Sequence, residues 1–190
     1  MPQNPSSTLP TLSLPAKLFW IIGLVGVDRW TKVLALEHIK DHPPQVFFGD
    51  LFRMEYAENP GAFLSLGASL SAETRFWIFA VAVGVFLIGA SWVLFRENFG
   101  GKSAPPPADK ILDVLTAFSL SVIIGGGIGN LIDRATRANH GVVDFLNVGI
   151  GSFRTGIFNV ADMAIMLGVI LLAWRSFKRS DSPTPQKAQA

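Results

Sequence analysis

The twenty residues from Phe76 to Phe95, FWIFAVAVGVFLIGASWVLF, decide the fold class of this chain. They contain no charged residue, and a helix of about twenty residues spans roughly 30 Å, which is the thickness of the hydrocarbon core of a bilayer. The stretch therefore predicts a transmembrane helix.

Three further segments have a similar length and an apolar character. With the first segment, the expected helices cover residues 17–36, 76–95, 111–132 and 158–177. The second half of the helix over 17–36 is the least apolar part, because it carries Asp28, Arg29 and Lys32. The helix over 111–132 ends in a glycine-rich run, which favours close helix packing. We expect an α-helical membrane protein with four transmembrane helices in one membrane-embedded domain over 17–177.

The composition supports a membrane protein and excludes several other classes. Hydrophobic residues make up 49% of the chain and charged residues 16%, whereas about a quarter of the residues in soluble domains are charged. The net charge of +2 and the lack of a basic block argue against a nucleic-acid partner. The absence of cysteine excludes disulfides and thiolate chemistry. His38, His42 and His140 do not have metal-binding spacing, so we expect no metal and no cofactor.

The two ends of the chain are polar. Residues 1–16 and 178–190 are expected to be disordered tails. Four spans place both tails on one side of the membrane with the loop over 96–110. Counting Lys and Arg, but setting aside those at helix ends, favours the cytoplasm for that side. The loops over 37–75 and 135–157 then share the outer face.

The outer loops contain signs of a small β-element. Residues 51–57 alternate between apolar and polar side chains, which is typical of a half-buried strand. Asn59-Pro60-Gly61 follows and favours a tight turn. Residues 142–148 form a second candidate strand. We expect a small extracytoplasmic sheet on the outer end of the helices.

Two carboxylates occur where a membrane protein rarely carries them. Asp144 stands in the apolar string VVDFL, and Asp162 lies just inside the apolar segment that begins at Phe158. An ionisable group at the edge of the membrane is costly, so its default interpretation is functional. The expected topology brings both residues to the outer face, where paired aspartates favour general acid–base chemistry.

Polar residues from other segments are expected at the same level. Asn159 and Asp162 are three residues apart, and Asn130 and Arg134 are four apart, so each pair shares a helix face. Asn59 arrives from the other outer loop.

These residues also have structural interpretations. Asp162 would suit the positive end of a helix dipole, and Asp144 would suit a turn or an arginine partner. The asparagines at 130 and 159 would suit hydrogen bonds between membrane helices. Asp28 and Lys32 would suit an ion pair at a helix end.

Five segments of the sequence, taken together, distinguish these interpretations. They are Asp28-Arg29-Trp30-Thr31-Lys32, Asn59-Pro60-Gly61-Ala62, Gly126–Arg134 (GGIGNLIDR), Val142-Val143-Asp144-Phe145 and Phe158-Asn159-Val160-Ala161-Asp162. Their order and spacing resemble those of the lipoprotein signal peptidases (signal peptidase II), the aspartic proteases of bacterial membranes. The resemblance covers about residues 17–177.

The resemblance implies a function and a set of site residues. It implies an endopeptidase in the bacterial inner membrane that cuts diacylglyceryl-modified prolipoproteins before the lipidated cysteine, with both termini cytoplasmic. Asp144 and Asp162 would be the catalytic pair, which activates water. Substrate-binding or dyad-supporting positions would be Asn59, Gly61, Asn130, Arg134 and Asn159. No cofactor or metal is implied, and nothing demands more than a monomer in contact with membrane lipid.

One segment departs from the family pattern. Phe63-Leu64-Ser65 follows Ala62, where the family usually has a small residue and then Phe. This difference is expected to change the shape of the substrate groove. We expect the apolar residues Phe47, Phe48, Phe63 and Leu64 to form a lid over the site.

Other functions remain compatible with parts of the sequence. A small transporter or proton channel would use Asp144 and Asp162 as relay carboxylates. A Ser-Lys protease would use Lys32 as the base, with Ser65 or Ser69 as the nucleophile. An inactive family member would keep the fold alone.

Overall fold

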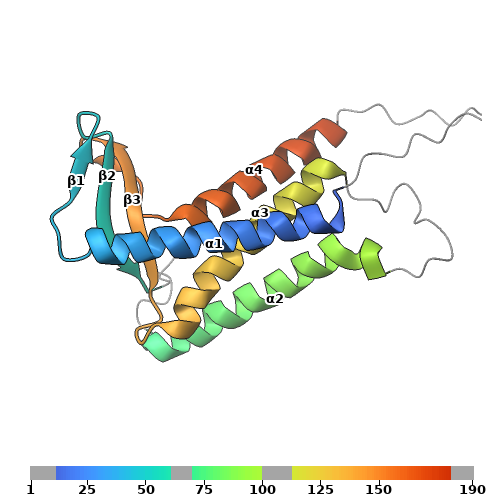
Figure 1. Cartoon of the computed structure of the whole chain (residues 1–190), viewed down its shortest axis with the longest axis horizontal. Helices are drawn as coiled ribbons and strands as arrows, with labels where there is room; N and C mark the ends of the chain where they lie inside the picture. The colour runs from blue at the N-terminus through green and yellow to red at the C-terminus, as the bar shows by residue number, and fades with distance from the viewer. Residues whose placement is uncertain (1–11, 61–69, 100–112, 181–190) are drawn as a thin grey trace, which may run out of the picture.

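The computed structural model describes residues 12–60, 70–99 and 113–180. This part of the chain forms a bundle of long helices with a small antiparallel sheet at one end (Figure 1). The helices are α1 (Leu14–His38), α2 (Ala72–Phe99), α3 (Val114–Thr136) and α4 (Val160–Ser180). The strands are β1 (Gln45–Phe47), β2 (Phe52–Asn59), β3 (Val142–Ile150) and β4 (Phe153–Arg154), in the order β1-β2-β3-β4.

The sheet contains both strands that the sequence predicts. β2 and β3 pair antiparallel, with Phe52 opposite Val148 and Asn59 opposite Val142. The two loop segments are therefore joined into one sheet, as expected. Asn59 ends β2, and Gly61 of the predicted turn lies outside the described residues.

The helix ends differ from the expected positions by a few residues. α1 begins at Leu14, inside the segment expected as a tail, because Pro15 is well tolerated in the first turn of a helix. α4 begins at Val160 rather than Phe158, because Asn159 caps it. The terminal segments 1–11 and 181–190 lie outside the described residues.

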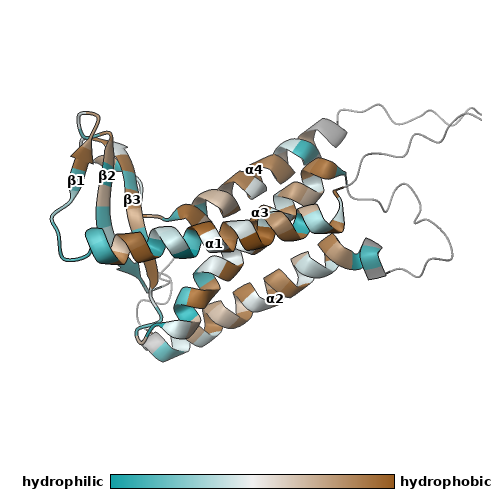
Figure 2. Cartoon of the chain, viewed as in Figure 1, coloured by the Kyte–Doolittle hydropathy of each residue, from teal (hydrophilic) through white to brown (hydrophobic). Residues whose placement is uncertain are grey.

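Three helical segments among the described residues are long and apolar enough to cross a membrane. They are Phe76–Arg96, Val114–Thr136 and Val160–Phe177. The α1 helix, expected as a fourth, is not among them, since it carries Asp28, Arg29 and Lys32 within its apolar stretch. Figure 2 shows mostly apolar residues along the helices, with polar residues concentrated near their ends and in the loops.

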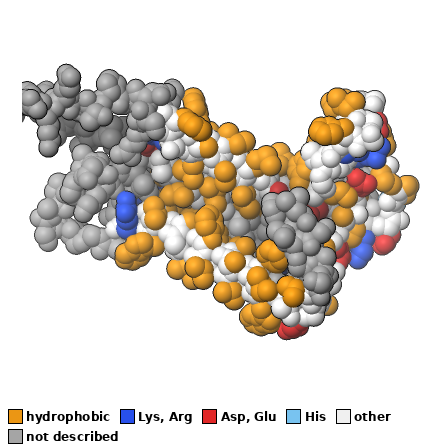
Figure 3. Space-filling view, turned by 180° about the vertical axis from the view of Figure 1, so that it is seen from behind, with side chains coloured by type: hydrophobic (Ala, Val, Ile, Leu, Met, Phe, Trp, Pro, Cys, Tyr) orange, Lys and Arg blue, Asp and Glu red, His pale blue; other side chains and the backbone are white. Residues whose placement is uncertain are grey.

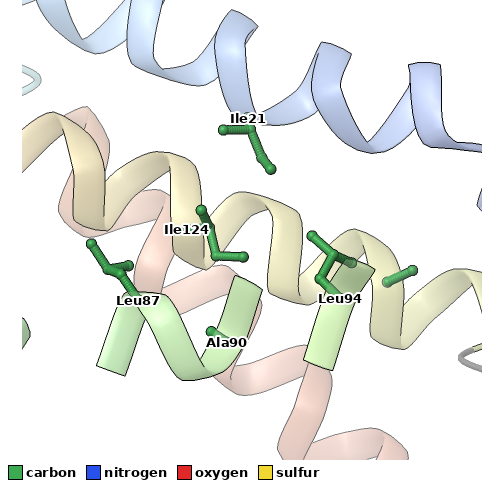
Figure 4. Packing of buried hydrophobic residues seen from close by; sticks show 6 residues of the cluster. Ile21, Leu87, Ala90, Leu94 and Ile124 are labelled. Atoms are coloured by element: carbon green, nitrogen blue, oxygen red, sulfur yellow. The ribbon is translucent and has the colours of Figure 1, made fainter. Parts of the chain in front are cut away.

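The core of the bundle is built around α3. Ile21 of α1, Leu87, Ala90 and Leu94 of α2, and Ile124 of α3 pack together (Figure 4). On the other side, α3 approaches α4 so closely that a Cβ atom at Gly126 would lie 2.5 Å from the carbonyl oxygen of Ala161. Glycine is therefore required at this crossing.

A second cluster joins the sheet to the bundle. Ala35 and Ile39 of α1 pack against Val143 and Phe145 of β3. These contacts hold β3, with Asp144 between the two packed residues, against the end of the helices.

Candidate active site

Asp162 lies in the first turn of α4, where it forms a reciprocal cap with Asn159. The backbone N–H of Asp162 donates to Oδ1 of Asn159 at 3.0 Å, and the N–H of Asn159 donates to Oδ2 of Asp162 at 3.1 Å. This is the geometry of a capping box. The structural interpretation of Asp162 as a helix N-terminal acid is thus correct, but the cap occupies only one of its carboxylate oxygens.

The side chain of Asn159 links this cap to Asp144 on β3. Its Nδ2 donates to Oδ1 of Asp144 at 2.6 Å. The strand itself is hydrogen-bonded to the residue before the cap, because the N–H of Phe158 donates to the carbonyl of Leu146 at 2.8 Å. One asparagine therefore contacts both predicted catalytic carboxylates, although β3 and α4 are separate elements.

Asn130 of α3 supplies the second amide of the site. Its Nδ2 donates to Oδ1 of Asp162 at 2.7 Å, while its Oδ1 accepts from Nζ of Lys32 at 2.8 Å. An ammonium group can only donate, so Lys32 must face the amide oxygen. This contact turns the amide nitrogen of Asn130 toward Asp162.

Lys32 belongs to a buried ion network between α1 and α3. Its Nζ lies 3.0 Å from Oδ2 of Asp28 and 2.9 Å from Oδ2 of Asp133. Arg29 contacts the same two acids, at 2.6 Å from Asp133 and 3.1 Å from Asp28. Two cations and two carboxylates leave this cluster neutral. The predicted pair of Asp28 and Lys32 is present.

The same network holds the backbone next to each candidate catalytic residue. Oδ1 of Asp28 accepts from the N–H of Ala161 at 3.2 Å, and Oδ2 of Asp133 accepts from the N–H of Val143 at 3.2 Å. Ala161 precedes Asp162, and Val143 precedes Asp144. This role of Asp133 is not predicted from the sequence; its position three residues after Asn130 on one helix is the available signal.

Asp144 is the most buried of the candidate residues that carry a charge, with 1% of its surface exposed. Burial, together with the nearby charge of Asp162, raises the pKa of Asp144 to about 7. Hydrogen bonds from Asn159 and Asn59 act in the opposite direction on this pKa. Asn59 thus reaches the site from β2, as expected.

The two arginines beside the site behave differently. Arg134 lies within electrostatic reach of both Asp144 and Asp162, and its Nη1 donates to the carbonyl of His140 at 3.4 Å. Arg137 is turned away and pairs with Glu58. Arg134 is therefore placed with the site, whereas Gly61 lies outside the described residues.

An apolar groove of about 560 Å³ opens beside Asp162. One wall is formed by the segment from Thr155 to Phe158 with Val148, and the other by α4. The α4 residues of the wall are Asp162, Met163, Met166, Leu167 and Ile170. Asp162 lies at the polar end of this otherwise apolar groove.

In the described part of the chain, no three His, Asp or Glu side chains are arranged to hold a metal ion. The chemistry available from these residues is that of paired carboxylates, held by amides and close to an arginine.

Comparison with known proteins identifies the family. Residues 20–178 match the family model of signal peptidase (SPase) II. This chain belongs to the signal peptidase II family. The match covers most of the sequence and confirms the resemblance found in its five segments. Signal peptidase II is a peptidase, and the apolar helices fit a membrane protein.

Individual relatives of this signal peptidase II family member support the same family assignment. It is 32% identical over 163 residues to the lipoprotein signal peptidase of Borrelia duttonii, covering 83% of this chain and 87% of the relative. It is 32% identical over 176 residues to that of Xanthomonas axonopodis pv. citri, covering 90% of this chain and 93% of the relative. A solved bacterial membrane enzyme has the same fold, with a TM-score of 0.71 at 21% identity over 95% of this chain and 99% of that one.

Proposed function

We propose that this protein is a membrane aspartic endopeptidase that removes the signal peptide from diacylglyceryl-modified prolipoproteins. It cuts on the amino side of the lipidated cysteine, and Asp144 and Asp162 form its catalytic dyad. The observation that supports this best is the position of Asn159, which hydrogen-bonds to both carboxylates. Family membership supports the peptidase activity and the class of substrate.

The different surroundings of the two aspartates favour different roles. Asp144 is buried and its pKa is raised to about 7, so a large share of this side chain is protonated near neutral pH and can act as the acid. Asp162 accepts hydrogen bonds from Asn130 and from the N–H of Asn159, which favour its charged form. Arg134 lies near both carboxylates and compensates the single negative charge of the dyad.

These roles give a sequence of proton transfers. Asp162 takes a proton from a water molecule, whose oxygen attacks the scissile carbonyl carbon. Asp144 gives its proton to the departing nitrogen as the carbon–nitrogen bond breaks. The product acid and amine are released, and the proton on Asp162 returns to Asp144 or to solvent. The reaction needs neither a covalent enzyme intermediate nor a cofactor.

The groove beside Asp162 suits a substrate that carries lipid. Its walls are apolar along α4, and it ends at the acid. Acyl chains would lie against Met166 and Ile170 while the peptide backbone reaches the dyad. This arrangement would let the enzyme select a lipid-modified chain without lifting its acyl groups into water.

A serine–lysine mechanism is disfavoured by the contacts of Lys32. Its ammonium group is paired with Asp28 and Asp133 and donates to Asn130. These three contacts engage its amino group, so Lys32 is poorly placed to act as a general base. Ser65 and Ser69, the proposed nucleophiles of that mechanism, lie outside the described residues.

The placement in the membrane is part of the proposal. α1 is the fourth span, because Asp28 and Lys32 are buried against α3 and α4 rather than turned to lipid. Both termini are cytoplasmic, and the sheet and the dyad lie at the outer face of the bacterial inner membrane. The enzyme acts as a monomer.

The test is cleavage of a lipid-modified prolipoprotein by the purified protein and by Asp144→Asn and Asp162→Asn. Each change should lower turnover by at least ~10²–10⁴-fold, the usual effect of losing a general acid or base. The matched control is Asp113→Asn. Asp113 caps α3 at the other end of the bundle, and asparagine caps helices equally well. Full activity in either dyad variant would refute the assignment, whereas loss in the control would indicate a general folding defect.

A further inference from the structure

Two adjacent turns of the sheet carry large apolar side chains in exposed positions. Phe48 lies in the turn between β1 and β2, and Ile150 and Phe153 flank the turn between β3 and β4. The exposed fractions are 83% for Phe48, 77% for Ile150 and 88% for Phe153. We call these three residues the apolar tip. Figure 3 shows hydrophobic atoms at the end of the sheet.

The apolar tip is held in place by bonds between the two turns. The N–H of Gly149 donates to the carbonyl of Leu51 at 2.9 Å. Nη1 of Arg154 donates to the carbonyl of Asp50 at 2.7 Å. Phe48 has a φ of 54°, a left-handed conformation that is rare for a bulky residue. The side chain of Phe48 is not buried in the fold, so packing within the protein does not explain why a phenylalanine occupies this position.

The apolar tip is continuous with a part of the protein surface that faces lipid. The sheet and the start of α4 form the two walls of the apolar groove, and the exposed α4 residues Met163, Met166 and Ile170 continue into a candidate span. Figure 1 shows the sheet projecting beyond α4 to the side of the bundle. The apolar tip therefore extends sideways over the region that lipid occupies around α4.

The charged groups behind the apolar tip match a lipid surface. Asp50 pairs with Arg53 and lies 3.5 Å from Arg154, which leaves one net positive charge behind three apolar side chains. Apolar side chains at the tip with paired charges directly behind them fit the boundary between acyl chains and phosphate headgroups.

We propose that Phe48, Ile150 and Phe153 insert into the membrane leaflet at the sheet end of the bundle and anchor the sheet to the lipid surface. The occupant of this surface is the lipid itself. Phe48 then contacts lipid instead of covering the site as the lid predicted from the sequence. The anchor fixes the sheet wall of the groove relative to the bilayer and does not depend on the identity of the catalytic residues.

The absence of cysteine from the chain makes a direct test possible. Phe48→Cys, Ile150→Cys and Phe153→Cys each carry one nitroxide label, with Gln45→Cys as the control. Gln45 is exposed on β1, at the end of that strand away from the tip. Each protein is placed in nanodiscs of phosphatidylethanolamine and phosphatidylglycerol, one copy per disc. Collision rates of the label with oxygen, which concentrates in lipid, and with a water-soluble nickel chelate are measured.

The expected result is that oxygen relaxes the labels at the three tip positions more strongly than the nickel chelate does, with the reverse at Gln45. Tip labels that resemble the Gln45 label would overturn the proposal. Tip labels that are immobilised and shielded from both reagents would indicate a protein contact and would also overturn it. Prolipoprotein cleavage by the same unlabelled variants separates this outcome from any failure of the proposed peptidase function.

Discussion

At the scale of single residues, the buried Asp144 of the proposed dyad lowers the stability of the folded protein at high pH. The pKa of Asp144 is about 7 in the folded protein and near 4 in an unfolded chain. Between those pH values the folded state holds a proton that the unfolded state has released. The free energy of unfolding therefore falls as the pH rises through this window. At pH 8 the folded protein must bury the negative charge of Asp144.

Replacing Asp144 by asparagine should relieve this cost. Asp144→Asn is expected to be more stable than the parent at pH 8, by at most about 4 kcal/mol, with the difference vanishing near pH 4. Thermal unfolding in one detergent across this pH range measures it. Asp113→Asn should behave oppositely, because the cap of α3 and Arg175 lower the pKa of Asp113. A stability difference for Asp144→Asn that does not change with pH would contradict the burial of its charge.

The residues of the site differ in how far the sequence could reveal them. Asp144, Asp162, Asn130 and Asn159 were predicted, because each lies in a short segment with a recognisable pattern. The role of Asp133 was not predicted, since it depends on Arg29, 104 positions away in the chain. Contacts of that kind require the packing of α1 against α3, which no local pattern specifies.

At the scale of elements, the α3–α4 crossing determines where Asp162 of the proposed dyad lies. Gly126→Ala is expected to force α4 away from α3, because the new Cβ would lie 2.5 Å from the carbonyl oxygen of Ala161. The expected loss of stability is about 1–3 kcal/mol, as for other overpacked sites. Activity should fall as well, since Ala161 adjoins Asp162. Thermal unfolding and cleavage assays measure the two effects.

The control for this change is Gly84→Ala in α2. A Cβ at Gly84 meets no atom within 4 Å, so the substitution should keep both stability and activity. Equal behaviour of the two variants would mean that the close approach of α3 and α4 is not required.

The strands and helices themselves were predictable, because alternation and apolar length are local properties. The helix ends were less so, since caps such as Asn159 move them by a few residues.

At the scale of the whole molecule, the proposed topology depends on α1. Ser13 precedes this helix and His42 follows it, and both are exposed. Ser13→Cys and His42→Cys should therefore react on opposite sides of the membrane. An impermeant maleimide is expected to label the cysteine at position 42 in intact spheroplasts and the one at position 13 only after lysis. Labelling of both positions from the same side would exclude α1 as a span.

The ion network between α1 and α3 has a consequence for biogenesis. During synthesis, Asp28, Arg29 and Lys32 leave the ribosome about a hundred residues before Asp133. A charged side chain at the centre of an inserting helix costs about 2.5–3.5 kcal/mol. On the proposed topology, the first helix should therefore wait at the translocon or at the lipid interface, and enter the bilayer stably only when the third helix brings its acid. Insertion would then be a joint event of helices far apart in the chain.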